Sequence, residues 1–240
     1  MEKILLLTRR ELSAYFVSPI AYVAMALFLL LAGVFFAFPW FGAFRPGQPA
    51  QMQYVFSVMT FVLMLVVPAL TMRSLAEERG SGTIETLLTA PVTDLEVVLA
   101  KFLGCWLFYL GMLAPTLLYA VALAVFGNPD FGPIVGGYVG LALLGAMYVA
   151  VGVLASSLTR AQVIAFVVAF FPLLVLWVLG PIGGSLPSPW RTILREAGTL
   201  AHYEDFNRGV IAAVHVAYFV TVTVYALFLT VKVLESRRWR

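Results

Sequence analysis

The sequence predicts an all-α, polytopic membrane protein with six transmembrane helices. Hydrophobic residues make up 62% of its 240 residues, whereas charged residues make up only 11%. A soluble domain of ordinary composition is about 45–50% apolar and about 25% charged. A chain with so few charges cannot cover a water-facing surface, and six of its apolar stretches are long enough to cross a bilayer core of about 30 Å. We therefore expect a single membrane domain over residues 1–240.

The first span is predicted at roughly residues 19–41, with Ser18 as its N-cap and Pro19 in its first turn. The other five are expected at roughly 52–72, 97–126, 133–157, 161–181 and 210–233. Prolines inside three spans predict kinks more readily than breaks: Pro68, Pro115 and Pro172. Small residues in the third and fourth spans indicate close helix contacts, although glycine is common in membrane helices: Gly104, Gly111, Gly136, Gly137, Gly140 and Gly145.

Lysine and arginine are distributed unevenly between the two sides that six spans would create. If the N-terminus is cytoplasmic, eleven of the fifteen lie on that side: Lys3, Arg9, Arg10, Arg73, Arg79, Lys101, Arg160, Lys232, Arg237, Arg238 and Arg240. The other four lie on the opposite side: Arg45, Arg191, Arg195 and Arg208. Because cytoplasmic loops are enriched in these residues, both termini are expected in the cytoplasm.

An amphipathic helix is predicted before the first span, over residues 2–16. At about 100° per residue, one face holds apolar side chains, namely Ile4, Leu5, Leu12, Tyr15 and Phe16. The opposite face holds Glu2, Arg9, Arg10 and Ser13. Such a helix is expected to lie in the cytoplasmic membrane interface, with Arg9 and Arg10 near anionic lipid head groups.

A dense polar stretch over residues 71–101 separates the second and third spans. It holds eight of the 27 charged residues (15 basic plus 12 acidic). Gly80, Ser81 and Gly82 are expected to end the helix that continues from the second span, and residues 83–90 can form a short helix that stops at Pro91. Thr93 and Glu96 then form a capping box that opens the third span.

This stretch has two interpretations. It is either a solvated loop tightened by surface ion pairs, each contributing ~0–1 kcal/mol, or a docking surface for a soluble partner. We favour docking, because Ile84, Leu87 and Leu88 would leave an apolar face outside the bilayer. The candidate docking residues are Glu77, Glu78, Arg79, Gly80, Gly82, Thr83, Glu85, Leu87, Leu88 and Pro91.

The connection before the sixth span, residues 183–209, is the other long one. Ser188 and Pro189 can start a short helix there, and Gly198 can end it. The polar residues that follow are His202, Glu204, Asp205 and Arg208. A histidine near two carboxylates suggests a metal site or a proton relay. We favour a hydrogen-bonded structural cap over the last span, because residues so close in sequence rarely converge on one ion without other ligands.

The sequence lacks the motifs of several classes of membrane enzyme. Gly183-Gly184-Ser185 is followed by leucine and not by the glycine of a rhomboid-like serine protease, and the two histidines do not form His-Glu-x-x-His. The sequence has no Walker lysine motif, one cysteine (Cys105) and no charge near the centre of a span. We expect a non-catalytic chain with no metal, cofactor or nucleic acid of its own, so another subunit must power any active transport.

One run within the polar stretch is similar to a family signature, E-x-x-x-G-T-x-E-x-L-L-x-x-P-V. The run is Glu78-Arg79-Gly80-Ser81-Gly82-Thr83-Ile84-Glu85-Thr86-Leu87-Leu88-Thr89-Ala90-Pro91-Val92. The signature is that of the permease subunits of ABC-2 type (type V) ATP-binding-cassette transporters. The predicted layout of six spans, interfacial helix and two long connections resembles those permeases along the whole chain. A second run, residues 202–211 (HYEDFNRGVI), resembles the gliding-motility-associated branch.

The resemblance implies that residues 83–90 are a coupling helix seated on a separate ATPase, which binds ATP and Mg. It implies a smaller second contact at residues 157–162 and an interfacial helix that flanks the transport pathway. Two permease chains, identical or paralogous, and two ATPases would work together in the bacterial cytoplasmic (inner) membrane, among its lipids. The expected function is export of an amphiphilic substrate. The alternative is a mechanical transmitter that acts on an extracytoplasmic partner and moves no cargo.

Overall fold

A computed structural model of the chain describes residues 2–38, 43, 51–82, 92–127 and 129–238, and within these ranges it contains helices and no strand. The first half comprises α1 (Glu2–Val17), α2 (Pro19–Ala37), α3 (Gln53–Thr71), α4 (Ala76–Gly80), α6 (Asp94–Leu113) and α7 (Leu117–Phe126). The second half comprises α8 (Phe131–Leu158), α9 (Gln162–Gly184), α10 (Trp190–Ala197), α11 (Thr199–Asn207) and α12 (Ala213–Arg238).

Six helical segments in the described part of the chain are long and apolar enough to cross a membrane, which agrees with the expected polytopic all-α class. The third of them bends, because a 3-10 turn over Ala114–Thr116 at Pro115 separates α6 from α7. Pro68 and Pro172 lie within α3 and α9, which continue through them. Ser18 occupies the N-cap position of α2, as predicted, although its side chain makes no capping hydrogen bond. The Ser18 hydroxyl lies instead 3.4 Å from the Arg73 guanidinium.

The core lies between α3, α6 and α8, which pack closely because glycines admit large side chains. A Cβ added to Gly145 of α8 would lie 2.1 Å from the Tyr109 ring of α6, and one added to Gly137 would lie 2.3 Å from the Phe56 ring of α3. The Tyr109 hydroxyl donates a hydrogen bond to the Leu141 carbonyl at 2.7 Å, which satisfies it inside the core. Gly111 has nothing within 4 Å of such a Cβ and contributes no close contact.

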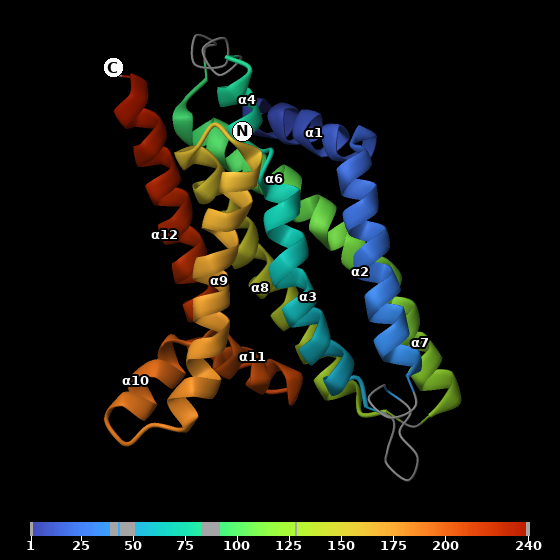
Figure 1. Cartoon of the computed structure of the whole chain (residues 1–240). Helices are drawn as coiled ribbons and strands as arrows, with labels where there is room; N and C mark the ends of the chain where they lie inside the picture. Colours follow the sequence, from blue (N-terminus) through green and yellow to red (C-terminus); the bar gives the residue numbers. More distant parts are fainter. Residues whose placement is uncertain (1, 39–42, 44–50, 83–91, 128, 239–240) are drawn as a thin grey trace.

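The bundle has two distinct ends (Figure 1). One end, which we call the basic end, carries α1, α4 and the C-terminal end of α12. The other, the cap end, carries α10 and α11. Helix α1 runs across the basic end and turns into α2, which descends through the bundle (Figure 1). The crosswise course of α1 is the one expected of an interfacial helix.

The side chains on the apolar face predicted for α1 differ in their surroundings: some pack on α6 and others are exposed. Tyr15 stacks on Phe108 of α6 with ring centroids 5.3 Å apart, whereas Leu5 and Phe16 are 74% and 53% exposed. The side that faces α6 includes Glu11, because a buried lysine of α6 pairs with its carboxylate. Arg9 and Arg10 are exposed, as their position on the polar face predicts.

Candidate functional site

The polar turn after α3 is attached to the end of α8 through Ser156. The Ser156 hydroxyl accepts hydrogen bonds from the backbone N–H groups of Leu75 and Ala76, both at 2.9 Å, and donates to the Met72 carbonyl at 3.1 Å. A helix N-terminus leaves N–H groups without intrahelical partners, and a hydroxyl from another helix supplies the acceptor here. Ser156 therefore determines where α4 starts relative to α8.

Arg79 adds a second attachment between α4 and α8. Its side chain is buried, and its guanidinium donates a short hydrogen bond to the Ser157 carbonyl. Gly80 lies beside the next turn, where an added Cβ would come within 3.1 Å of the Arg160 carbonyl oxygen. The turn after α3 and the short connection at residues 157–162 are thus packed against one another.

A buried lysine joins α4 to two further elements. Lys101 lies in α6 with its side chain 2% exposed, and its ammonium group is 2.7 Å from a Glu78 carboxylate oxygen and 3.3 Å from one of Glu11. Removing an ammonium group from water is costly unless it is paired, and two carboxylates provide the pairing here. The ion-pair cluster of Lys101, Glu78 and Glu11 therefore ties α4, α6 and α1 together.

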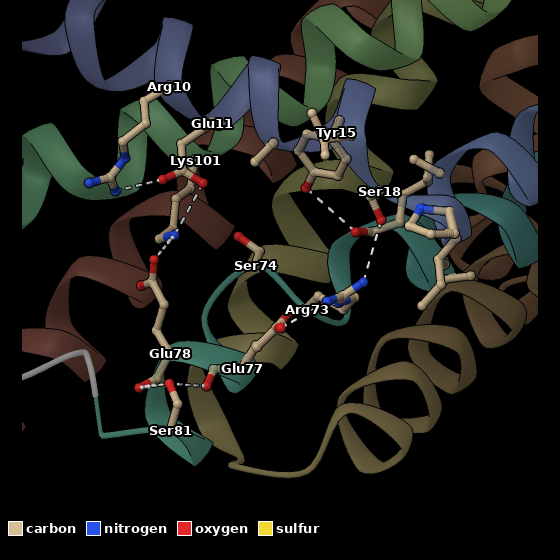
Figure 2. Close-up of a pocket in the computed structure, with 17 residues that line it drawn as sticks. Arg10, Glu11, Tyr15, Ser18, Arg73, Ser74, Glu77, Glu78, Ser81 and Lys101 are labelled. Carbon is tan, nitrogen blue, oxygen red and sulfur yellow. Dashed lines mark hydrogen bonds and ion pairs between the residues drawn. The ribbon is translucent and has the colours of Figure 1, made fainter.

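A cavity of about 740 Å³ opens between these elements at the basic end (Figure 2). Arg73 lies within it and makes a two-pronged ion pair with Glu77, at 2.7 and 2.8 Å. Burial raises the pKa of the Tyr15 phenol well above its ordinary value, so the hydroxyl stays neutral. It faces the Leu70 carbonyl oxygen at 3.5 Å. Apolar side chains complete the wall: Val17, Pro19, Ile20, Ala21, Ala69 and Leu70. The cavity is therefore amphipathic, with charged groups on one side and apolar groups on the other.

The residues on either side of the segment 83–91 have well-defined geometry. Gly82 adopts a φ of +77°, a left-handed conformation that favours glycine. At the other end, the Thr93 N–H donates to the Glu96 carboxylate at 2.9 Å and the Glu96 N–H donates to the Thr93 hydroxyl at 3.2 Å, so the predicted capping box is present. Thr83, Glu85, Leu87, Leu88 and Pro91 lie outside the described residues.

Reasoning from the sequence missed Glu11 and two further members of this site. Lys101 was counted only as a basic residue near a membrane surface, and Ser156 was not singled out. Lys101 offered one signal, because a lysine two turns into an apolar helix requires a counter-charge. The partners could not be named from spacing, since Glu11 is 90 residues away.

At the cap end, α11 brings His202 and Asp205 against His215 of α12. His202 is 3% exposed, and its ring contacts that of His215, a pairing that the spacing of the two histidines in the sequence did not predict. Arg208 lies 3.7 Å from Glu204 and 3.9 Å from Asp205 on the same turn. Among the described residues, no group of three or more His, Cys, Asp or Glu side chains is arranged to hold a metal ion.

Comparison with known proteins agrees with this architecture. Residues 42–196 match the profile of a family described as ABC-2 family transporter protein. A relative from Escherichia coli (strain K12), named Probable multidrug ABC transporter permease YbhS, is 28% identical over 137 residues, which are 55% of this chain and 36% of the relative. One from Pseudomonas aeruginosa, named Probable ABC transporter permease protein NosY, is 34% identical over 86 residues, or 33% and 31% of the two chains.

The chain thus aligns with about a third of the length of these curated relatives. The narrower resemblance of residues 202–211 to the gliding-motility branch stays a prediction. The family profile spans well over half of the sequence, including the third and fourth spans, α10 and the polar stretch with its α4 attachment. Together with the six apolar helices, this match shows that the chain is a multi-pass membrane protein of the ABC-2 transporter family, in which it is a permease subunit.

Proposed function

We propose that this chain couples ATP hydrolysis in a separate ATPase subunit to movement of its own membrane helices, and so to export of an amphiphilic substrate. The working unit would contain two ATPase subunits and a second permease chain, in the bacterial inner membrane with both termini in the cytoplasm. ATP and Mg would be bound by the ATPase. The basic end of the bundle would then face the ATPase.

The observation that carries this proposal is the attachment of α4 to three other elements. Glu78 and Arg79 belong to the signature run, and they contact Lys101 of α6 and the end of α8. Glu11 extends the ion-pair cluster to α1. A force applied to the stretch after Gly82 would therefore reach the third and fourth spans and the interfacial helix together.

Ser156 and Ser157 provide a matched pair of variants for testing this coupling. Ser156→Ala removes the acceptor for two N–H groups at the start of α4. In the part of the chain that the structure describes, the Ser157 hydroxyl donates only to the Leu154 carbonyl of its own helix, at 2.6 Å. We expect Ser156→Ala to reduce permease-dependent ATPase activity several-fold in lipid nanodiscs, and Ser157→Ala to leave it unchanged. Both variants should co-purify the ATPase as the wild type does.

A pull-down from detergent-solubilised membranes sets the baseline for this experiment. The wild type is expected to recover an ABC ATPase, and a variant lacking residues 80–90 is expected to lose it. If neither chain recovers an ATPase, the proposed docking role is wrong. Equal activity of the two serine variants would instead contradict the role of α4 while leaving docking intact.

One set of contacts favours the alternative, a mechanical transmitter that moves no cargo. Two threonines inside the spans are bonded to their own helices: Thr60 donates to the Ser57 carbonyl and Thr116 to the Leu113 carbonyl, both at 2.7 Å. They therefore offer little lining for a hydrophilic pathway within one chain. Transfer of a fluorescent lipid analogue by the reconstituted complex would eliminate the transmitter, whereas ATP hydrolysis with no lipid or solute transfer would support it.

A further inference from the structure

Two histidines meet at the cap end, one from α11 and one from the start of α12. Their Nδ1 atoms lie 2.7 Å apart. The Nε2 of His202 lies 2.8 Å from the Glu196 carbonyl oxygen, and the Nε2 of His215 lies 2.7 Å from an Asp205 carboxylate oxygen. All four ring nitrogens are therefore at hydrogen-bonding distance from a partner.

Counting protons across these contacts determines the charge of the pair. A carbonyl oxygen and a carboxylate only accept hydrogen bonds, so each Nε2 must carry a hydrogen. The Nδ1–Nδ1 contact requires one more hydrogen, carried by either ring. Three hydrogens on four ring nitrogens make one imidazole and one imidazolium, because a neutral imidazole carries only one.

We propose that His202 and His215 form a proton-binding site that holds one extra proton between the two rings, balanced by Asp205. The site joins the cap helix α11 to the sixth span α12. It is independent of the proposed ATPase coupling, because its residues lie at the opposite end of the bundle (Figure 1).

The surroundings of the pair are consistent with one positive charge. Tyr218 of α12 stacks on His202, with ring centroids 4.0 Å apart, and presents a π-face to it. Three charged residues of α10 line the adjoining cavity, namely Arg191, Arg195 and Glu196. Arg208 lies 3.9 Å from Asp205 and shares its charge. With two arginines nearby and one carboxylate in contact, a second extra proton on the rings would be disfavoured.

Changes of protonation in either direction weaken this set of contacts. Loss of the extra proton leaves two hydrogens for three contacts, so one of the three hydrogen bonds is lost. Gain of a second places two N–H groups and two positive charges face to face at the Nδ1 contact. The cavity beside the rings, of about 210 Å³, brings this site close to the medium at the cap end. The connection between α11 and α12 is therefore strongest while the pair holds one extra proton.

Nitrogen-15 NMR of the histidine rings tests the proton count directly. The chain contains only these two histidines, so selective labelling of the untagged full chain in lipid bilayers reports on them alone. At about pH 7 we expect three of the four ring nitrogens to be protonated. Asp205→Asn, which removes the balancing charge, is expected to lower the count to two. Glu204→Gln is the matched control, since Glu204 pairs with Arg208 at 3.7 Å and has no contact with the rings, and it should keep three.

Thermal unfolding gives a second measurement that does not depend on the NMR spectra. The shared proton links α11 to α12 in the folded chain. His215→Gln, which cannot share that proton, should lower the unfolding midpoint relative to the wild type, whereas Glu204→Gln should not. A count of two or four protons in the wild type, or an Asp205→Asn count that stays at three, would overturn the proposal.

Discussion

Lys101 illustrates how a single buried charge can organise a membrane-protein interface. Its ammonium group is 2% exposed and lies between carboxylates from α1 and α4, although it belongs to α6. Each carboxylate retains some contact with solvent, so the lysine bears most of the desolvation cost. By contrast, Lys232 near the C-terminal end of α12 is exposed and pairs with the Glu235 carboxylate of its own helix at 2.7 Å.

Replacing this lysine should destabilise the protein more than replacing it together with a partner. We expect Lys101→Met to cost about 3 kcal/mol, the low end for breaking a buried pair, because Glu78 and Glu11 lose the buried ammonium group that they share, although Glu11 keeps its exposed partner Arg10 at 2.9 Å. The double variant Lys101→Met with Glu78→Gln should recover part of that loss. Thermal unfolding in detergent, followed by tryptophan fluorescence, measures both; equal stability of the single and double variants would contradict the pairing.

Local residue patterns were predictable, whereas contacts between distant residues were not. The capping box of Thr93 and Glu96 follows from a four-residue motif, and the structure contains both hydrogen bonds. The pairing of His202 with His215 depends on the angle at which α11 returns to α12, which no local pattern encodes. The hydrogen bonds of Ser156 were not predictable either, because its partners Leu75 and Ala76 are about 80 residues away in the sequence.

At the scale of the helices, side-chain size determines which helices approach closely. Gly145 and Gly137 of α8 lie against aromatic rings of α6 and α3, and Gly104 of α6 lies against α1, where an added Cβ would come 2.7 Å from that of Glu11. A glycine in these helices is not always a contact position, since Gly111 of α6 has no atom within 4 Å of an added Cβ. Glycine content therefore predicted that α6 and α8 pack closely, but not which positions touch.

These glycines supply a matched comparison within the bundle. Gly145→Ala places a methyl group 2.1 Å from the Tyr109 ring, an overpacking that should cost about 1–3 kcal/mol. Gly111→Ala meets nothing within 4 Å and should leave stability unchanged or slightly raised, because alanine favours helices. Unfolding midpoints of the two variants compared with the wild type test the difference, and a similar loss in both would show that helix packing is not responsible.

At the scale of the whole molecule, the two ends of the bundle differ in charge and in construction. The basic end carries α1, α4 and the C-terminal end of α12, while the cap end carries α10 and α11 (Figure 1). The number and apolar character of the spans were predictable from composition, because burial in lipid constrains every residue of a span. The crosswise position of α1 on α6 was not, since it depends on Glu11 and Lys101.

The orientation of the bundle can be tested with single cysteines. Cys105 is buried, so a Cys105→Ala background removes the natural thiol at a site that reagents do not reach. Ser13 of α1 and Ser185, just after α9, are exposed at opposite ends. We expect a membrane-impermeant maleimide to label Ser185→Cys in intact spheroplasts and Ser13→Cys only after permeabilisation. The reverse pattern would place the basic end outside and contradict the charge distribution.

The attachments on either side of residues 83–91 have a consequence for how such permeases diversify. On one side, α4 is held by Ser156 and Lys101; on the other, α6 is capped by Thr93 and Glu96. All four residues lie outside the stretch itself, so substitutions within 83–91 leave the anchors intact. If residues 83–91 carry the proposed ATPase contact, substitutions there can change partner preference between paralogues while the anchors in the membrane domain stay the same.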